Sequence, residues 1–112
     1  MSNSDDAIER EIVEKGKTAP RITPQMLEDQ VMTEYWGRAS DLFSQAPAQK
    51  ALECLTICVI TTKNGFTLTG TSACASPENY DAELGRKIAR AKAIEQLWPL
   101  MGYELKSKLN AV

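Results

Sequence analysis

The feature that most constrains the fold is an Asn-Gly pair, Asn64-Gly65, between two segments rich in β-branched residues. Such a pair between strand-like segments is the strongest local signal for a β-hairpin. We therefore expect one strand over residues 52–62 and a second over residues 66 to about 73. A two-residue turn makes Lys63 face Phe66, which fixes the register of the hairpin.

This register assigns the hairpin side chains to two faces. The face expected to form the core carries Leu55, Ile57, Val59, Thr61, Phe66, Leu68, Gly70, Ser72 and Cys74. The opposite face carries Cys54, Thr56, Cys58, Ile60, Thr62, Thr67, Thr69, Thr71 and Ala73. This second face is small, flat and half polar. Because two strands alone are marginally stable, we expect a second subunit or the N-terminal helices to cover it.

Two helices are expected before the hairpin. Ser4 is a suitable N-cap for a helix that ends near Lys15, and a linker over residues 16–22 follows it. Thr23-Pro24 is typical of a helix start, and the spacing of apolar residues extends this second helix to about Trp36. Residues 37–49 are ambiguous between a frayed continuation and a loop.

A long helix is expected after the hairpin, beginning near Ser76 or Asn79 and ending near Leu109. Pro99 lacks an amide donor and predicts a kink within it. The apolar stripe that should lie on the hairpin comprises Leu84, Ile88, Ala91, Ile94, Trp98, Met101, Leu105 and Leu109.

The predicted fold class is therefore α+β, an antiparallel β-hairpin packed on a long C-terminal helix, with one or two N-terminal helices. Residues 1–22 are expected to form an N-terminal helix and linker, and residues 23–112 a single α+β domain.

The absence of histidine excludes more functions than any residue that is present. The 112 residues include none, so Ser-His-Asp and Cys-His catalysis and imidazole zinc sites are excluded. We expect a protein that is not an enzyme, with no catalytic residues, no metal site and no cofactor. The three cysteines are interpreted as buried thiols, since the predicted register points Cys54 and Cys58 one way and Cys74 the other.

The remaining composition limits the classes of partner and the cellular location that we expect. The net charge of −2 gives no general attraction to DNA or to an anionic membrane. No apolar run reaches the roughly 20 residues that cross a bilayer. The N-terminus lacks the regions of a secretory signal, and an odd number of cysteines favours a cytosolic protein.

Two arginines on the last helix, Arg86 and Arg90, suggest an anion site. They lie one turn apart, and free backbone N–H groups at the helix start would add to the attraction for phosphate. The alternative is a solvated face of salt bridges with neighbouring carboxylates, which is about equally compatible with the sequence.

Further polar residues complete the candidate ligand-binding set. Asn79 and Ser76 lie between hairpin and helix, where an amide can read a base or ribose edge, although the same turn can simply cap the helix. Phe66 is either a core residue or a platform for base stacking. Thr69 belongs to a threonine row that is otherwise an exposed sheet face.

Several short pieces between Asn64 and Tyr103 occur in a specific order and spacing. They are Asn64-Gly65-Phe66-Thr67, Ser72-Ala73-Cys74, Pro77-Glu78-Asn79-Tyr80, Gly85-Arg86-Lys87-Ile88, and Ile94 through Tyr103 with Trp98 and Gly102. In these pieces the chain resembles a family of small tailed-phage proteins described as gene-49/gene-66-like. It is also similar to the phage anti-Thoeris sponge proteins.

The resemblance implies a function in the host cytoplasm. Those sponges are non-enzymatic oligomers that sequester cyclic ADP-ribose-type signals and, in some members, cyclic oligonucleotides. It implies a phage accessory protein, a homo-oligomer, that binds a cyclic nucleotide. The acidic net charge separately predicts that the chain binds neither DNA nor a membrane. Asn79 matches the Pro-x-Asn-aromatic element of the family. The alternative is an adaptor that inhibits or redirects a host protein through the flat threonine face or the N-terminal helix.

Overall fold

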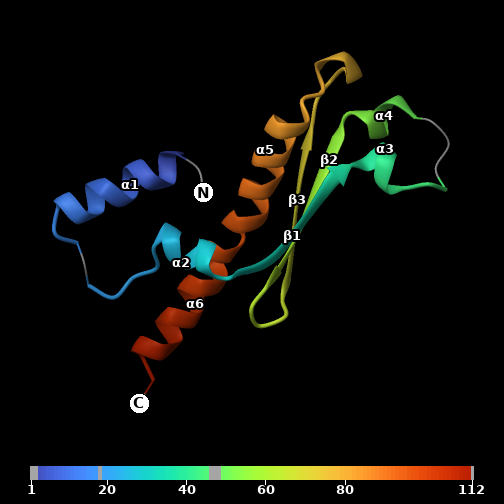
Figure 1. Ribbon diagram of the computed structural model, residues 1–112. Coiled ribbons are helices and arrows are strands. Elements are labelled where there is room, and N and C mark those ends of the chain that lie inside the picture. The colour runs from blue at the N-terminus through green and yellow to red at the C-terminus, as the bar shows by residue number, and fades with distance from the viewer. Residues whose placement is uncertain (1–2, 18, 46–48, 112) are drawn as a thin grey trace.

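The computed structural model describes residues 3–17, 19–45 and 49–111. The elements are, in order, α1 (Asn3–Glu14), α2 (Pro24–Asp29), β1 (Val31–Arg38), α3 (Ala39–Leu42), α4 (Lys50–Glu53), β2 (Leu55–Thr62), β3 (Thr67–Ala73), the 3₁₀ turn η1 (Pro77–Asn79), α5 (Ala82–Glu95) and α6 (Leu97–Leu109). The fold is α+β, as expected, with an antiparallel sheet packed against the C-terminal helical region (Figure 1).

The sheet has three strands in the order β1-β2-β3, one more than the hairpin predicted from the sequence. The second helix starts as expected, with the Thr23 side chain accepting a hydrogen bond from Met26 N, but it ends at Asp29. Its predicted continuation to Trp36 is wrong, because residues 31–38 form β1 and pair antiparallel with β2. This segment is rich in β-branched and aromatic residues, and the ladder to β2 satisfies its backbone.

The hairpin turn contains three residues, so the predicted register is wrong by one position. Thr62 N donates to Phe66 O at 2.8 Å, and Gly65 adopts a positive φ of 87°. A glycine in this conformation closes a three-residue hairpin loop. The pairing is therefore Thr61 with Thr67 and Cys58 with Gly70. A shift of one residue exchanges the two faces of a strand, and the core face of β2 is the one predicted to lie outside.

Helix α5 covers one face of the sheet (Figure 1). The core beneath it consists of Leu27, Cys58, Ile60, Leu68, Ala89, Ala93, Ile94 and Leu97. In α5 the buried positions include Gly85, Ala89 and Ala93, whereas Leu84 is 55% exposed and Ile88 is 39% exposed. The predicted stripe is thus off by one position in the first half of the helix.

The reason for this shift is a close approach of backbones at Gly70 on β3. A Cβ at this position would lie 2.0 Å from Ala89 O and 2.7 Å from Ala93 N. Only small residues fit where helix and strand come this close, so the large side chains of α5 flank the contact instead.

The C-terminal helical region is interrupted at Gln96, which ends α5 and begins α6. Pro99 follows three residues later, and its ring clashes with the carbonyl group of the residue four positions earlier. The interruption lies about one turn before the proline, at Gln96, and the kink expected at Pro99 itself stays a prediction. No helix in the described ranges is long and apolar enough to cross a membrane.

Candidate functional site

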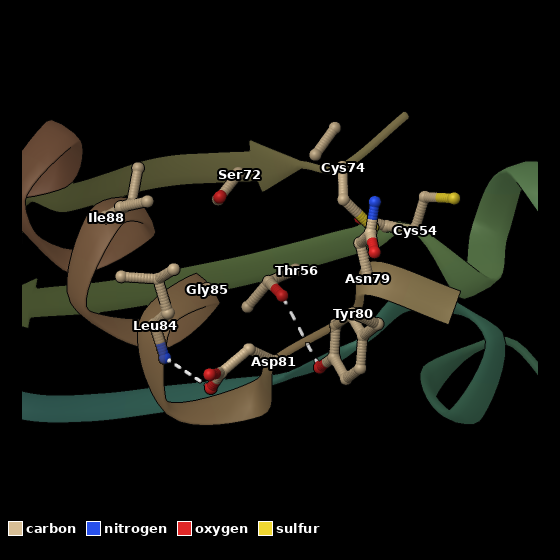
Figure 2. A pocket seen from close by; sticks show the side chains of 11 residues that line it. Cys54, Thr56, Ser72, Cys74, Asn79, Tyr80, Asp81, Leu84, Gly85 and Ile88 are labelled. Carbon is tan, nitrogen blue, oxygen red and sulfur yellow. Dashed lines mark hydrogen bonds between the residues drawn. The ribbon is translucent and has the colours of Figure 1, made fainter. Parts of the chain in front are cut away.

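The candidate site is a recess of about 140 Å³ at the end of the sheet where β2 and β3 meet the segment that leads into α5 (Figure 2). Its lining residues come from β2, β3 and the cysteines that flank these strands, from the end of η1 and the two residues after it, and from the first turns of α5. They are Cys54, Thr56, Ser72, Ala73, Cys74, Asn79, Tyr80, Asp81, Leu84, Gly85 and Ile88.

The floor of the recess depends on the observed register. Thr56 pairs with Ser72 across the strands, so the two residues share a face. Thr56 Oγ1 donates to the Tyr80 hydroxyl at 3.4 Å, as Figure 2 shows. Gly85 lies above Thr56, and a Cβ there would come within 2.5 Å of Thr56 Oγ1. The glycine thus allows α5 to begin directly over the floor.

Asp81 fixes the start of α5 at the rim. It is the N-cap residue, and its carboxylate accepts a hydrogen bond from Leu84 N at 3.0 Å. A carboxylate at this position already satisfies one helix-start amide and complements the helix dipole. An anionic ligand at the same amides would meet a negative charge.

Arg38, the last residue of β1, lies beside the recess. Its guanidinium stacks over the ring of Tyr80, 4.1 Å from the centroid, and its Nε donates to Glu53 O at 2.5 Å. Within residues 3–17, 19–45 and 49–111, the terminal nitrogens of Arg38 form no further hydrogen bond or ion pair. This leaves a guanidinium next to the recess that can bind an anion.

Two thiols form the far wall. Cys74 N donates to Cys54 O at 3.1 Å, and Cys74 Sγ lies 3.6 Å from the same oxygen. The prediction that Cys74 points away from Cys54 is wrong, because the register places them opposite each other. Burial, and next the neighbouring Cys74 thiol, raise the pKa of the Cys54 thiol, so it stays protonated at neutral pH.

The third cysteine, Cys58, lies beneath α5 in the core, and burial raises the pKa of its thiol. The interpretation as buried thiols is confirmed for Cys54 and Cys58, whereas Cys74 is partly exposed. Among the described residues, no group of three or more His, Cys, Asp or Glu side chains is placed to hold a metal ion.

Arg86 and Arg90 lie outside the recess, in a network of ion pairs with carboxylates of α2 and β1. Arg86 Nε donates to Glu34 Oε2 at 2.8 Å, and Arg90 Nε donates to Glu34 Oε1 at 2.7 Å. Arg90 also forms a two-pronged ion pair with Glu28. The network ties α5 to β1 and α2. The alternative of salt bridges is therefore correct in kind, but the partners are distant in sequence and the pairs are partly buried, whereas the sequence suggested a solvated face with neighbouring carboxylates.

The pKa values of these groups reflect mutual stabilisation of charge. For Glu34, burial acts to raise the pKa, but hydrogen bonds from Arg90 and Arg86 outweigh it and hold the pKa below its ordinary value. The hydrogen bond from Arg90 lowers the pKa of Glu28, and the one to Glu28 raises the pKa of Arg90. These groups are therefore charged and mutually neutralised at neutral pH.

The other residues of the predicted set are scattered over the sheet. Of that set, Asn79 lines the recess, and Ser76 precedes it as the N-cap residue of η1. Phe66 lies at the hairpin tip, at the other end of the seven residues of β3, beside a different hollow. Thr69 lies on the sheet face away from α5, and its carbonyl oxygen accepts a hydrogen bond from Gln96 at 2.6 Å. The predicted residues therefore do not form one site.

The sequence prediction missed the residues that accompany Asn79 in and beside the recess. Thr56 and Ser72 were assigned to opposite faces because the turn was taken as two residues long. Arg38 was assigned to an ambiguous segment beyond a helix. Tyr80 was within reach of sequence reasoning, since it directly follows Asn79 in the Pro-x-Asn-aromatic element.

Comparison with known protein families gives a match. The model of the family described as Phage protein (N4 Gp49/phage Sf6 gene 66) matches residues 22–109, which include the sheet, the recess and both C-terminal helices. The chain belongs to this family of phage proteins. Searches of curated proteins and of solved structures find no match.

Proposed function

We propose that this chain is a non-enzymatic phage accessory protein that binds and sequesters a small phosphorylated nucleotide in the host cytoplasm. The ligand would be a host immune signal of the cyclic ADP-ribose or cyclic oligonucleotide type. The observation that carries the proposal is the recess around Asn79, in which polar side chains from three parts of the chain converge. Membership of a phage family and the resemblance to the anti-Thoeris sponges support the same function.

The chemistry of the recess suits a base or a ribose. The hydroxyl groups of Thr56 and Ser72, the amide of Asn79 and the carboxylate of Asp81 offer donors and acceptors, while Leu84 and Ile88 form an apolar rim. Its volume of about 140 Å³ is below the roughly 300–1,000 Å³ of pockets that enclose a whole drug-sized ligand. One ring of the nucleotide would enter, and the rest would lie across the rim.

The phosphate is assigned to Arg38 in this proposal. Glu34 and Glu28 already neutralise Arg86 and Arg90, and Asp81 occupies an amide at the start of α5. The terminal nitrogens of Arg38 are available to bind a ligand, and its guanidinium stacks on Tyr80, which lines the recess. Direct contact of Arg86 or Arg90 with the ligand stays a prediction that requires these ion pairs to open.

Calorimetric titration with cyclic ADP-ribose isomers and cyclic dinucleotides tests the proposal. We expect binding by the wild-type protein and a loss of about tenfold or more in affinity for Asn79→Ala, since one unmade hydrogen bond to a desolvated ligand costs roughly 1–3 kcal/mol. Asn110→Ala is the matched control, because Asn110 caps α6 at the far end of that helix. Phe66→Ala should also leave binding unchanged.

Two outcomes would reject the proposal in different ways. If none of these nucleotides binds, the assignment of the ligand class is wrong. If one binds with equal affinity to wild type and Asn79→Ala, but more weakly to Phe66→Ala, the ligand lies in the hollow at the hairpin tip instead.

A protein-interaction adaptor is the second candidate, and α1 is the observation that favours it. The apolar side chains of Ile8 and Val13 on this helix are each more than half exposed, and α1 stands apart from the sheet (Figure 1). Affinity capture from host lysate separates the two functions. A stoichiometric host protein supports the adaptor, whereas a nucleotide released on denaturation supports the sponge.

A further inference from the structure

Cys54 and Cys74 lie directly opposite each other at the end of the hairpin. The register pairs Leu55 with Ala73, and one step further out Cys74 N donates to Cys54 O at 3.1 Å. In an antiparallel ladder, hydrogen-bonded partners of this kind have Cα atoms about 5.5 Å apart. A disulfide spans Cα distances of roughly 4.4–6.8 Å. The backbone at this pair therefore has the spacing that a disulfide requires.

The two side chains also project to the same face of the sheet, as opposed residues of an antiparallel pair do. Both line the recess, and Figure 2 shows them next to each other at one end of it. Helix α4, which precedes Cys54, contacts η1, which follows Cys74. Both residues are free thiols in the structure, and rotation of the side chains about their Cα–Cβ bonds would bring the sulfur atoms together.

The three cysteines of the chain differ in access and in partners. Cys54 is 8% exposed, whereas Cys74 is partly exposed. Cys58 is fully buried beneath α5, and its partner across the strands is Gly70, which has no side chain. Because oxidants reach exposed thiols first, Cys74 is the expected point of entry. The chain thus has one opposed pair of thiols and a third, isolated thiol as an internal control.

We propose that Cys54 and Cys74 form a reversible disulfide when the protein meets a small-molecule disulfide such as oxidised glutathione. The Cys74 thiolate attacks one sulfur of glutathione disulfide, a mixed disulfide forms on Cys74, and one glutathione thiolate leaves. The Cys54 thiolate then attacks Cys74 Sγ and releases the second glutathione. Two protein thiols thereby lose two protons and two electrons, and one glutathione disulfide becomes two thiols.

The second attack is made by the less reactive thiol. Since the pKa of Cys54 is raised, little of this residue is thiolate at neutral pH. The attack takes place within one molecule, however, and proximity offsets the small thiolate fraction. Excess reduced glutathione reverses both steps, as expected for the transient disulfides of cytosolic proteins.

The disulfide would join the start of β2 to the end of β3 and close a loop of residues 54–74. Such a loop restricts the unfolded chain, so the oxidised protein should be more stable than the reduced one. The bond would form in the wall of the recess and leave Thr56 and Ser72 in place. The proposal does not depend on nucleotide binding, because the disulfide needs no ligand and a ligand needs no disulfide.

Mass spectrometry of the full-length protein tests the proposal. The wild-type chain is equilibrated with reduced and oxidised glutathione at rising ratios, and the remaining thiols are blocked with N-ethylmaleimide. We expect the oxidised chain to lose two hydrogen atoms, to yield a linked pair of peptides with Cys54 and Cys74, and to carry the blocking group on Cys58. The urea midpoint should shift upward on oxidation and return on reduction.

Substitutions separate the two steps. Cys54→Ser should accumulate a glutathione adduct on Cys74, Cys74→Ser should keep Cys54 reduced, and neither should show the shift in urea midpoint. Cys58→Ala is the control and should form the disulfide as the wild type does. A wild-type chain that keeps three free thiols, or that stops at an adduct on Cys74, would overturn the proposal. A disulfide that contains Cys58, or one that links two chains, would overturn it as well.

Discussion

The two faces of the sheet are built from the same three strands but differ in how closely the rest of the protein packs against them. On the α5 face, Gly70 brings the backbone of the helix against the strand, and Glu34 binds both Arg86 and Arg90. On the other face, the described residues of the three strands include no charged side chain, and Tyr35 is 68% exposed. The difference shows that the conspicuous arginines belong to the part of the molecule that maintains the fold. The proposed ligand site lies apart from them, in the recess at the end of the α5 face.

The largest change in the free energy of unfolding is expected for a substitution at the contact between α5 and β3. In Gly70→Ala the new methyl group would meet backbone atoms of Ala89 and Ala93 at 2.0 and 2.7 Å. Backbone cannot move aside as a flexible side chain can, so we expect a loss of about 3 kcal/mol or more in the free energy of unfolding. Urea denaturation measures it.

Gly102→Ala is the control for this substitution. Gly102 lies within α6, and a Cβ there meets nothing within 4 Å. Alanine should raise stability by about 0.5–1 kcal/mol through its greater helix propensity. Equal effects of the two substitutions would show that α5 does not approach β3 this closely.

The next effect concerns the carboxylate that joins β1 to α5. Glu34→Gln removes the charge that Arg86 and Arg90 share, and we expect a loss of about 2 kcal/mol, in the range for hydrogen bonds to charged groups. Glu83→Gln is the matched control. Glu83 is 78% exposed in a pair with Lys87, and such surface pairs contribute about 0.5 kcal/mol or less. Similar losses in both variants would contradict the distinction between the faces.

The pH dependence of stability tests the same contribution of the partly buried carboxylates. The pKa values of Glu34 and Glu28 are lowered in the folded protein. Their contribution to the free energy of unfolding is therefore complete above the ordinary glutamate pKa of about 4.3. It is lost as the pH falls through the lowered values. Stability measured from pH 7 to pH 3 should therefore converge for wild type and Glu34→Gln at the acid end. If the difference in stability between the two proteins stayed constant over this pH range, the lost charge of Glu34 would not be the cause of the destabilisation.

The smallest effect is expected for the N-terminal segment. Residues 1–22 were predicted as a helix and linker outside a domain of residues 23–112. The structure ties α1 to the rest through contacts with α2 and the ion pair of Glu9 with Arg21. Removing residues 1–20 should change the free energy of unfolding of the remainder by less than about 1 kcal/mol. A chain that no longer folds would show that α1 belongs to the core.

The sequence predicted the fold class and most elements because their signals are local. The Asn64-Gly65 turn, the Thr23-Pro24 helix start and the interruption before Pro99 each depend on a few neighbouring residues. What failed depends on contacts distant in the sequence. Residues 31–38 have apolar spacing compatible with a helix, and pairing with β2 decides their structure.

The candidate site was predictable only in part for the same reason. One extra residue in the hairpin turn moved Thr56 onto the face of Ser72 and created the floor of the recess. Asn79 could be found from its motif. The role of Arg86 and Arg90 depended on carboxylates more than 50 positions away in sequence, which no local pattern indicates.

The most direct test of the account is NMR spectroscopy of the arginine Nε–H groups at neutral pH. If Arg86 and Arg90 are held by Glu34, their Nε–H signals should exchange slowly with water, and Glu34→Gln should accelerate that exchange. The exposed Arg10 gives the reference for a guanidinium at the protein surface. Exchange of Arg86 and Arg90 as fast as that of Arg10, in wild type and variant alike, would contradict the claim that these arginines maintain the fold.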